Sequence, residues 1–157
     1  MGRQTVLRAL HGQVIVTAAE LAPTKNRWLR AFAYGLLAEV ATIITIIVIV
    51  MLYRFVLARG LSKTEYDAFG AQVGAIVGPV GGTIWVFVFA RLLMRRLESR
   101  WVAHGIVVAI GAIVLSVAGS IAGHQGVPAG YVLASILKLI AGAAAGYLAA
   151  RRVAPVT

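Results

Sequence analysis

The chain contains no cysteine, which excludes a disulfide framework, a thiol nucleophile and a thiolate metal site. Acidic residues are also scarce: five Asp and Glu stand against fifteen Lys and Arg, giving a net charge of +10. Only 13% of the residues are charged and 61% are hydrophobic, a balance outside the range of soluble domains. The composition therefore predicts a multi-span membrane protein. Because the basic residues flank apolar segments, we expect them to face anionic lipid headgroups at the membrane surface and not nucleic acid.

Sequence motifs for catalysis and cofactor binding are missing as well. There is no phosphate-binding Gly-x-x-x-x-Gly-Lys loop, no His-Glu-x-x-His pair and no Gly-x-Ser-x-Gly elbow. The three histidines, His11, His104 and His124, fall in a tail, a helix end and a loop, so they are not expected to converge on one metal ion or haem. We therefore expect no enzymatic activity, no catalytic residues, no metal and no cofactor.

Four long apolar runs account for most of the chain. A spanning helix needs roughly 20 apolar residues. The runs that meet this requirement are 31–57, 68–93, 101–123 and 131–150. The expected fold is therefore an all-α integral membrane protein, a bundle of four transmembrane helices within residues 28–153.

The placement of Lys and Arg predicts the orientation of these spans. One side of the membrane receives Arg3, Arg8, Lys25, Arg27, Arg30, Arg91, Arg95, Arg96, Arg100, Arg151 and Arg152, and the other receives Arg54, Arg59 and Lys63. The positive-inside rule then places both termini in the cytoplasm, and Trp28 and Trp101 fit interfacial anchors on the same side. The expected location is a bacterial inner membrane.

The ends of the chain are expected to lie outside the bundle. Residues 1–27 do not resemble a signal peptide, because the apolar stretch is short and contains Glu20. They form either an amphipathic helix on the cytoplasmic interface or a loosely ordered segment. Residues 154–157 form a short C-terminal tail.

The two halves of the bundle share a weak internal similarity. Residues 30–35 (RAFAYG) align with 100–105 (RWVAHG), and residues 82–91 align with 142–151. A duplicated helical hairpin would explain these matches, and chance similarity between Gly- and Ala-rich spans would explain them equally well.

Two charges interrupt the apolar runs. Glu39 lies in the first span and Lys138 in the fourth, at depths of about 12 and 18 Å from the cytoplasmic edge at a helical rise of about 1.5 Å per residue. Charges at such depth cost about 2.5–3.5 kcal/mol each on insertion scales, so they are usually paired or functional. Our leading hypothesis is an intramembrane ion pair between Glu39 and Lys138, supported by Thr42 or Ser135. The alternatives are a snorkelling Lys138 beside a protonated Glu39, and a partner on another molecule.

Small residues mark the faces on which the helices are expected to pack. Glycines recur every four residues in the second span, and the row that contains Lys138 in the fourth span has the same spacing. In lipid no hydrophobic force brings helices together, so they associate through the close backbone contact that such small residues permit. The predicted helix-packing residues are Gly70, Gly74, Gly78, Gly82, Gly142 and Gly146. Packing within one chain and self-association through the stripe both remain possible.

Two function classes fit these features. The first is a non-catalytic structural or accessory subunit that packs with a larger membrane complex or with itself. The second is a small oligomeric transporter or channel with Glu39 as its coupling carboxylate. Four spans and a glutamate in the first resemble the small multidrug-resistance transporters, but the strong charge bias and Lys138 depart from their pattern. We therefore expect the accessory role.

Overall fold

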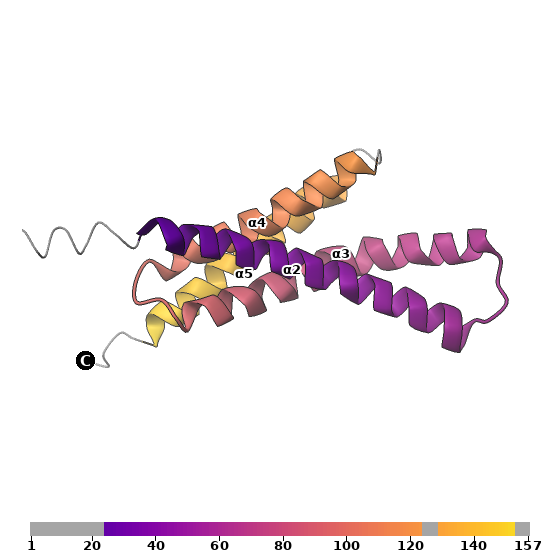
Figure 1. The fold of residues 1–157 in the computed structure, drawn as a ribbon, viewed down its shortest axis with the longest axis horizontal. Coiled ribbons are helices and arrows are strands. Elements are labelled where there is room, and N and C mark those ends of the chain that lie inside the picture. Colours follow the sequence, from indigo (N-terminus) through magenta and orange to yellow (C-terminus); the bar gives the residue numbers. More distant parts are fainter. Residues whose placement is uncertain (1–23, 124–128, 153–157) are drawn as a thin grey trace, which may run out of the picture. The chain divides into compact units, whose positions relative to one another are not determined.

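The computed structural model describes residues 24–123 and 129–152 of the chain. The elements within these ranges are α2 (Thr24–Leu52), the π-helical turn η1 (Tyr53–Leu57), α3 (Lys63–Met94), α4 (Trp101–Ala122) and α5 (Ala129–Arg151) (Figure 1). No strand occurs in this part of the chain. Four of its helices are long and apolar enough to cross a membrane, which confirms the expected all-helical fold at this level.

The chain divides into two compact units, Met1–Arg30 and Ala31–Thr157. The described part of the first unit, residues 24–30, is the start of α2, so the helix begins inside the segment expected to precede the bundle. The rest of the expected interfacial segment and the tail at 154–157 lie outside the described residues. The second unit contains the rest of α2 together with α3, α4 and α5.

The second helix begins five residues earlier than the apolar run at 68–93 indicates. Ser62 forms a capping box: its N–H donates to Glu65 Oε2 (2.8 Å), and its hydroxyl accepts from the Glu65 N–H (3.4 Å). Lys63 and Asp67 then form an exposed ion pair at 2.6 Å across one helical turn. The chain reverses just before the cap at Gly60, whose φ of +86° favours glycine. Local capping therefore extends α3 beyond its apolar stretch.

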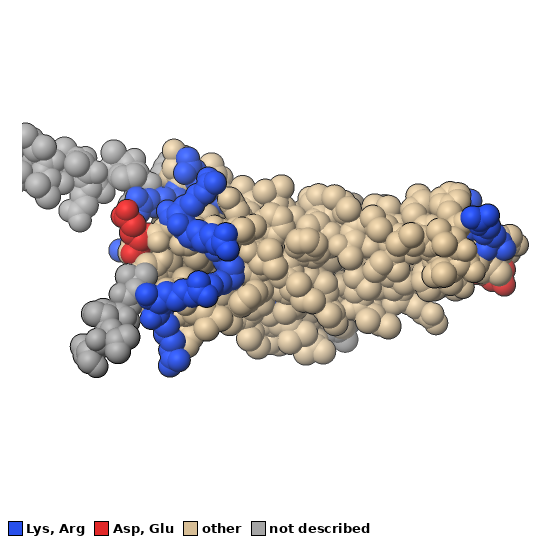
Figure 2. Space-filling model, turned by 90° about the horizontal axis from the view of Figure 1, so that it is seen from below, with Lys and Arg blue, Asp and Glu red and all other residues tan. Residues whose placement is uncertain are grey.

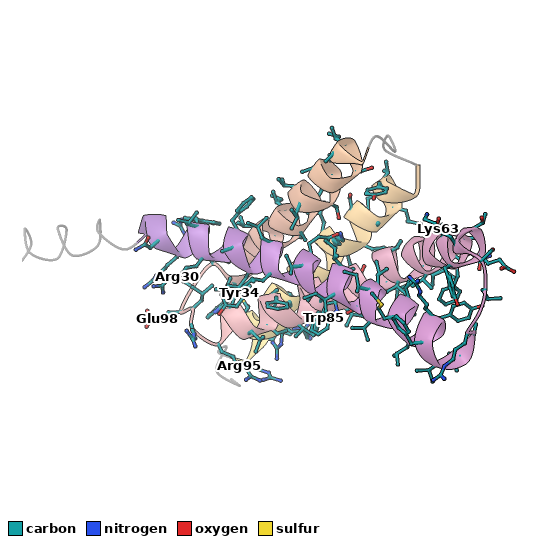
Figure 3. All side chains as sticks on the ribbon, turned by 45° about the vertical axis from the view of Figure 1, so that its right-hand side comes forward. Arg30, Tyr34, Lys63, Trp85, Arg95 and Glu98 are labelled. Carbon is teal, nitrogen blue, oxygen red and sulfur yellow. The ribbon has the colours of Figure 1, made fainter. Side chains whose placement is uncertain are left out.

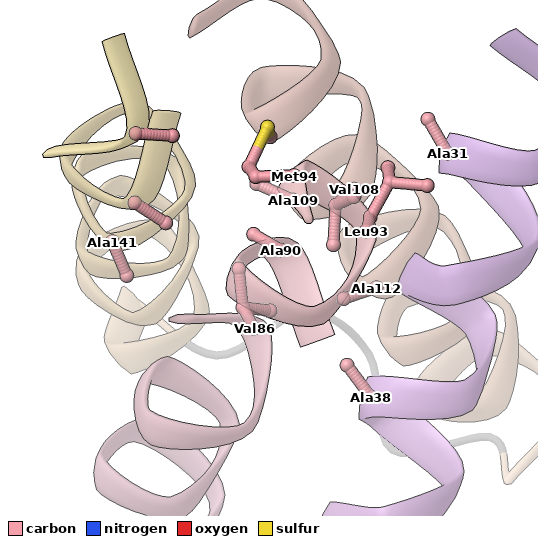
Figure 4. Close-up of a cluster of buried hydrophobic side chains, with 12 residues drawn as sticks. Ala31, Ala38, Val86, Ala90, Leu93, Met94, Val108, Ala109, Ala112 and Ala141 are labelled. Atoms are coloured by element: carbon pink, nitrogen blue, oxygen red, sulfur yellow. The ribbon is translucent and has the colours of Figure 1, made fainter. Parts of the chain in front are cut away.

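The hairpins α2–α3 and α4–α5 lie together at the end where α3 leads into α4, and they separate toward the opposite end (Figure 1). The buried apolar side chains follow this arrangement. Val86, Ala90 and Leu93 come from the second half of α3 and meet Val108 and Ala112 of α4 (Figure 4). The core of the unit therefore lies in one half of its length.

Glycines bring helix backbones into contact on two sides of α4. A Cβ added to Gly35 of α2 would collide with the backbone of α4 at Val108 and Gly111. On another side of α4, a Cβ on Gly105 would collide with the Gly142 carbonyl of α5, and one on Gly142 with the Gly105 carbonyl. Helix α4 is thus held between α2 and α5 at distances that only glycine permits.

Members of the predicted glycine stripes differ in their surroundings. Gly142 and Gly146 contact α4, the latter through the backbone of Trp101 and Val102. Gly82 of α3 contacts Lys138, whereas a Cβ on Gly74 or Gly78 would meet nothing within 4 Å and one on Gly70 only the side chain of Val50, at 3.9 Å. The α3 stripe does not act as a continuous packing surface within the described chain.

The outer surface of the unit is apolar along most of its length. Large side chains such as Ile44 and Ile76 are more than half exposed. Figure 2 shows Lys and Arg at the two ends, with an uncharged band between them. This surface is compatible with a multi-pass membrane protein.

The glycine contacts of α4 lead to a direct test. We expect Gly105→Ala to lower the free energy of unfolding by about 1–3 kcal/mol, because the added methyl group meets backbone that cannot move aside. Gly74→Ala is the matched control, since the methyl group enters open space and alanine favours the helix by about 0.5–1 kcal/mol. Equilibrium unfolding in mixed micelles measures both. Equal stabilities for the two variants would contradict the close approach of α4 and α5.

Candidate functional site: a buried ion pair shared by four helices

The two charges that interrupt the apolar runs lie together. Lys138 Nζ of α5 is 2.6 Å from Glu39 Oε2 of α2. Lys138 is 3% exposed and Glu39 8%, so both groups are removed from solvent and from the outer surface. The depth difference of about 6 Å inferred from the helical rise is spanned by the long lysine stem.

A hydroxyl from a third helix joins the pair. Ser116 of α4 accepts a hydrogen bond from Lys138 Nζ at 2.8 Å and donates one to Glu39 Oε1. The three side chains therefore form a closed network in which each carboxylate oxygen of Glu39 has its own donor. Satisfying these lone pairs matters, because burying a charge is tolerated only when it is paired and hydrogen-bonded.

Helix α3 contributes no polar group to the network, but its glycine leaves room for the lysine side chain. A Cβ on Gly82 of α3 would lie 2.6 Å from Lys138 Cε and 3.3 Å from its Nζ. The lysine stem therefore lies directly against the α3 backbone at this glycine. A Cβ at this position would require the end of the lysine side chain or the helix beside it to shift.

The two residues expected to support the pair do not do so. The Thr42 hydroxyl donates to the Ala38 carbonyl of its own helix at 3.0 Å, a common arrangement for threonine in apolar helices. Ser135 has no hydrogen bond to either charged group in the described ranges of the chain. Ser116 takes this role instead. Its signal in the sequence is its place in the α4 row of small residues that runs through Ala109, Ala112 and Ser120.

Helix α2 contacts α3 both before and after Glu39 in the sequence, and these contacts hold Glu39 in place. Toward the α2 N-terminus, Tyr34 packs edge-on against Phe89 with ring centroids 6.1 Å apart. Toward its C-terminus, Trp85 Nε1 donates to Thr45 Oγ1 at 3.1 Å. Figure 3 labels Tyr34 and Trp85 on these two helices. The carboxylate is thus positioned by a packed α2–α3 surface.

Among the described residues the one histidine, His104, does not contribute to this site. His104 is buried near the start of α4, where its Nδ1 lies 2.9 Å from the Arg100 carbonyl oxygen. His11 and His124 lie outside the described residues. Across residues 24–123 and 129–152, no three His, Asp or Glu side chains are grouped so that they could hold a metal ion.

Comparison with known proteins adds no function to this geometry. No protein-family model matches the chain, and no curated protein or solved structure is significantly similar to it.

We expect either single apolar substitution of the pair to be strongly destabilising. Glu39→Leu leaves a buried ammonium without its counterion, and Lys138→Leu leaves a buried carboxylate without its own, each at a cost of about 3–5 kcal/mol. The apolar double variant Glu39→Leu/Lys138→Leu removes both charges and should recover most of that loss. A double-mutant cycle from unfolding in mixed micelles measures the coupling. A double variant no more stable than the worse single one would argue against the pair.

The glycine beneath the lysine provides an independent test. Gly82→Ala should displace the ammonium and cost about 1–3 kcal/mol in the native background. The cost should shrink in the apolar double variant, because leucine at position 138 does not extend to the place of the lysine Cε. Gly78→Ala, one turn earlier in open space, is the control and should be tolerated in both backgrounds. A cost that is the same in both backgrounds would mean that Gly82 does not act through Lys138.

Proposed function

We propose that this protein is a non-catalytic multi-pass membrane protein, a structural or accessory subunit that packs with another membrane protein or with a second copy of itself. The observation that carries this proposal is the closed network of Glu39, Ser116 and Lys138. A carboxylate that holds one donor on each oxygen and is buried among four helices is suited to fixing a fold. It is poorly suited to exchanging protons with water during a transport cycle.

One uncovered face in the first half of α3 supports the packing role. A Cβ on Gly74 or Gly78 would enter open space, so this face of α3 is not packed against the described chain. In lipid, two helices associate through close van der Waals contact, for which glycine permits the nearest approach. A helix of a partner chain would find this approach on α3, where the described chain supplies no neighbour.

A bulky substitution on this face tests the proposal. We expect Gly74→Leu/Gly78→Leu to abolish cross-linking from a photoreactive residue at Ala75, both in native membranes and between copies in liposomes. The fold should be retained, because the leucines enter open space. A photoreactive residue at exposed Ile140 of α5 is the control position. Packing at this face would be contradicted if the photoreactive residue at Ala75 formed no cross-link when both glycines are present. It would also be contradicted if the two leucines left the cross-linking unchanged.

The runner-up is a small oligomeric transporter with Glu39 as its coupling carboxylate. Glu39 of α2 contacts Ser116 of α4 and Lys138 of α5, so it lies where the two hairpins meet. The separation of the hairpins toward one end favours this second function (Figure 1). Such a protein must release protons when a substrate binds. We expect no release when a broad panel of lipophilic cations is added to reconstituted protein in weak buffer. Proton release that disappears in Glu39→Gln would favour transport over the accessory role.

We further propose that both termini face the cytoplasm, where the basic side of the unit meets anionic headgroups. Because the chain has no cysteine, an introduced one is unique. In intact cells a membrane-impermeant maleimide should label Thr64→Cys in the first turn of α3 and not Ser99→Cys in the α3–α4 link. Opening the cells should expose Ser99→Cys. The reverse labelling pattern would invert the topology.

A further inference from the structure

The end of the unit where α3 leads into α4 concentrates positive charge. Its basic residues are all arginines: Arg91, Arg95, Arg96, Arg100, Arg151 and Arg152. Glu98 is the single acid in this part of the described chain. Figure 3 shows Arg95 and Glu98 at this end and Lys63 at the other, and Figure 2 shows the basic side chains gathered there. The opposite end is more balanced, with Arg54, Arg59 and Lys63 beside Glu65 and Asp67.

The arginines come from two segments that the fold brings together. The link of residues 95–100 is short, and Trp101, which follows it, has its backbone against Gly146 of α5. Since α4 and α5 run in opposite directions, the next turn of α5 after Gly146 brings Arg151 and Arg152 toward the level of Arg100. Arg100 adopts a left-handed conformation with φ of 54°, unusual for a residue other than glycine.

These guanidinium groups are not neutralised by the described chain. The ion pairs of residues 24–123 and 129–152 are Lys63–Asp67 and Glu39–Lys138. Arg151 lies over the Tyr147 ring at 4.8 Å, and Arg91 is half-buried. Arg95, Arg96, Arg100 and Arg152 remain exposed. Several unpaired like charges on neighbouring segments favour an external anion.

We propose that these four arginines bind the phosphate headgroup of an anionic phospholipid, at a site formed by the α3–α4 link and the residue that follows α5. Guanidinium groups bind phosphate through two parallel hydrogen bonds, which an ammonium cannot match. Exposed apolar side chains adjoin the arginines in the sequence: Val102 and Ile106 follow Arg100 in α4, and Leu148 precedes Arg152 in α5. They offer contact to acyl chains, so the phosphate recognised here is that of a lipid and not a free ion. Trp101, whose Nε1 donates to the Leu97 carbonyl at 2.9 Å, lies at the level expected for an interfacial tryptophan.

This site depends on the membrane location in the proposed function and not on the partner protein. Its test therefore uses the purified full chain reconstituted alone. Failure to bind the lipid would leave the cross-linking result at Ala75 unaffected, and the absence of a partner would leave the lipid preference unaffected.

The experiment compares brominated phosphatidylglycerol with brominated phosphatidylcholine as quenchers of Trp101 fluorescence, in nanodiscs and in a background with Trp28 and Trp85 changed to Phe. We expect a clear preference for the anionic lipid. The variant Arg95→Gln/Arg96→Gln/Arg152→Gln should lower that preference about fivefold per arginine, about a hundredfold in total. The matched control, Arg54→Gln/Arg59→Gln/Lys63→Gln, removes equal charge from the other end and should leave the preference unchanged. All three arginines of the test variant are exposed, so its circular dichroism should match that of the parent chain.

Two further arms separate a built phosphate site from general attraction and from a free-phosphate site. Replacing the same three arginines with lysine keeps the charge and removes the guanidinium fork, so the preference should fall partway. Millimolar inorganic phosphate should not displace the lipid. A lysine variant equal to the parent chain, a loss of preference in the control variant, or displacement by inorganic phosphate would each overturn the proposal.

Discussion

The cost of placing two opposite charges among apolar helices is the constraint on which this structure depends. Neither Glu39 nor Lys138 can remain alone in a low-dielectric setting, and their mutual attraction offsets the cost only when the geometry is close and the remaining lone pairs are satisfied. Three helices supply the polar groups, and the fourth supplies Gly82, against which the lysine stem lies. Forming this network therefore requires all four helices to be in place.

The glycine contacts and the ion pair reinforce one another. Backbone contact at Gly35 and Gly105 fixes α4 between α2 and α5. That close approach places Ser116 where it reaches both charged groups. In lipid, neither device has a general hydrophobic force to rely on, so close packing and specific hydrogen bonds carry the association of helices. Beyond this region α2 and α3 are held mainly by contacts with each other, such as the stacking of Tyr53 on Phe69 at 3.6 Å.

The sequence predicts the number of helices because a spanning helix requires an apolar run of a set length. It identifies Glu39 and Lys138 because charges within such runs are rare. It does not predict which hydroxyl supports the pair. Spacing places Thr42, Ser116 and Ser135 on helix faces, but the rotation of each helix against its neighbours decides which of them reaches the charges. The same limit applies to the α3 stripe, where four-residue spacing treats Gly78 and Gly82 alike and the neighbours differ. The α3 start at Lys63 was missed because it depends on the Ser62 cap, a polar signal outside the apolar run.

The position of the network within the packed half of the unit bears on how it functions. Exposing Glu39 to water would require Lys138 and Ser116 to withdraw and α2 to part from α4 where Gly35 meets the α4 backbone. Those contacts share one region, so they would have to open together. Motion at the separated ends of the hairpins leaves this region intact. The network therefore fixes the fold in the region where the four helices meet, which is what the proposed structural role requires.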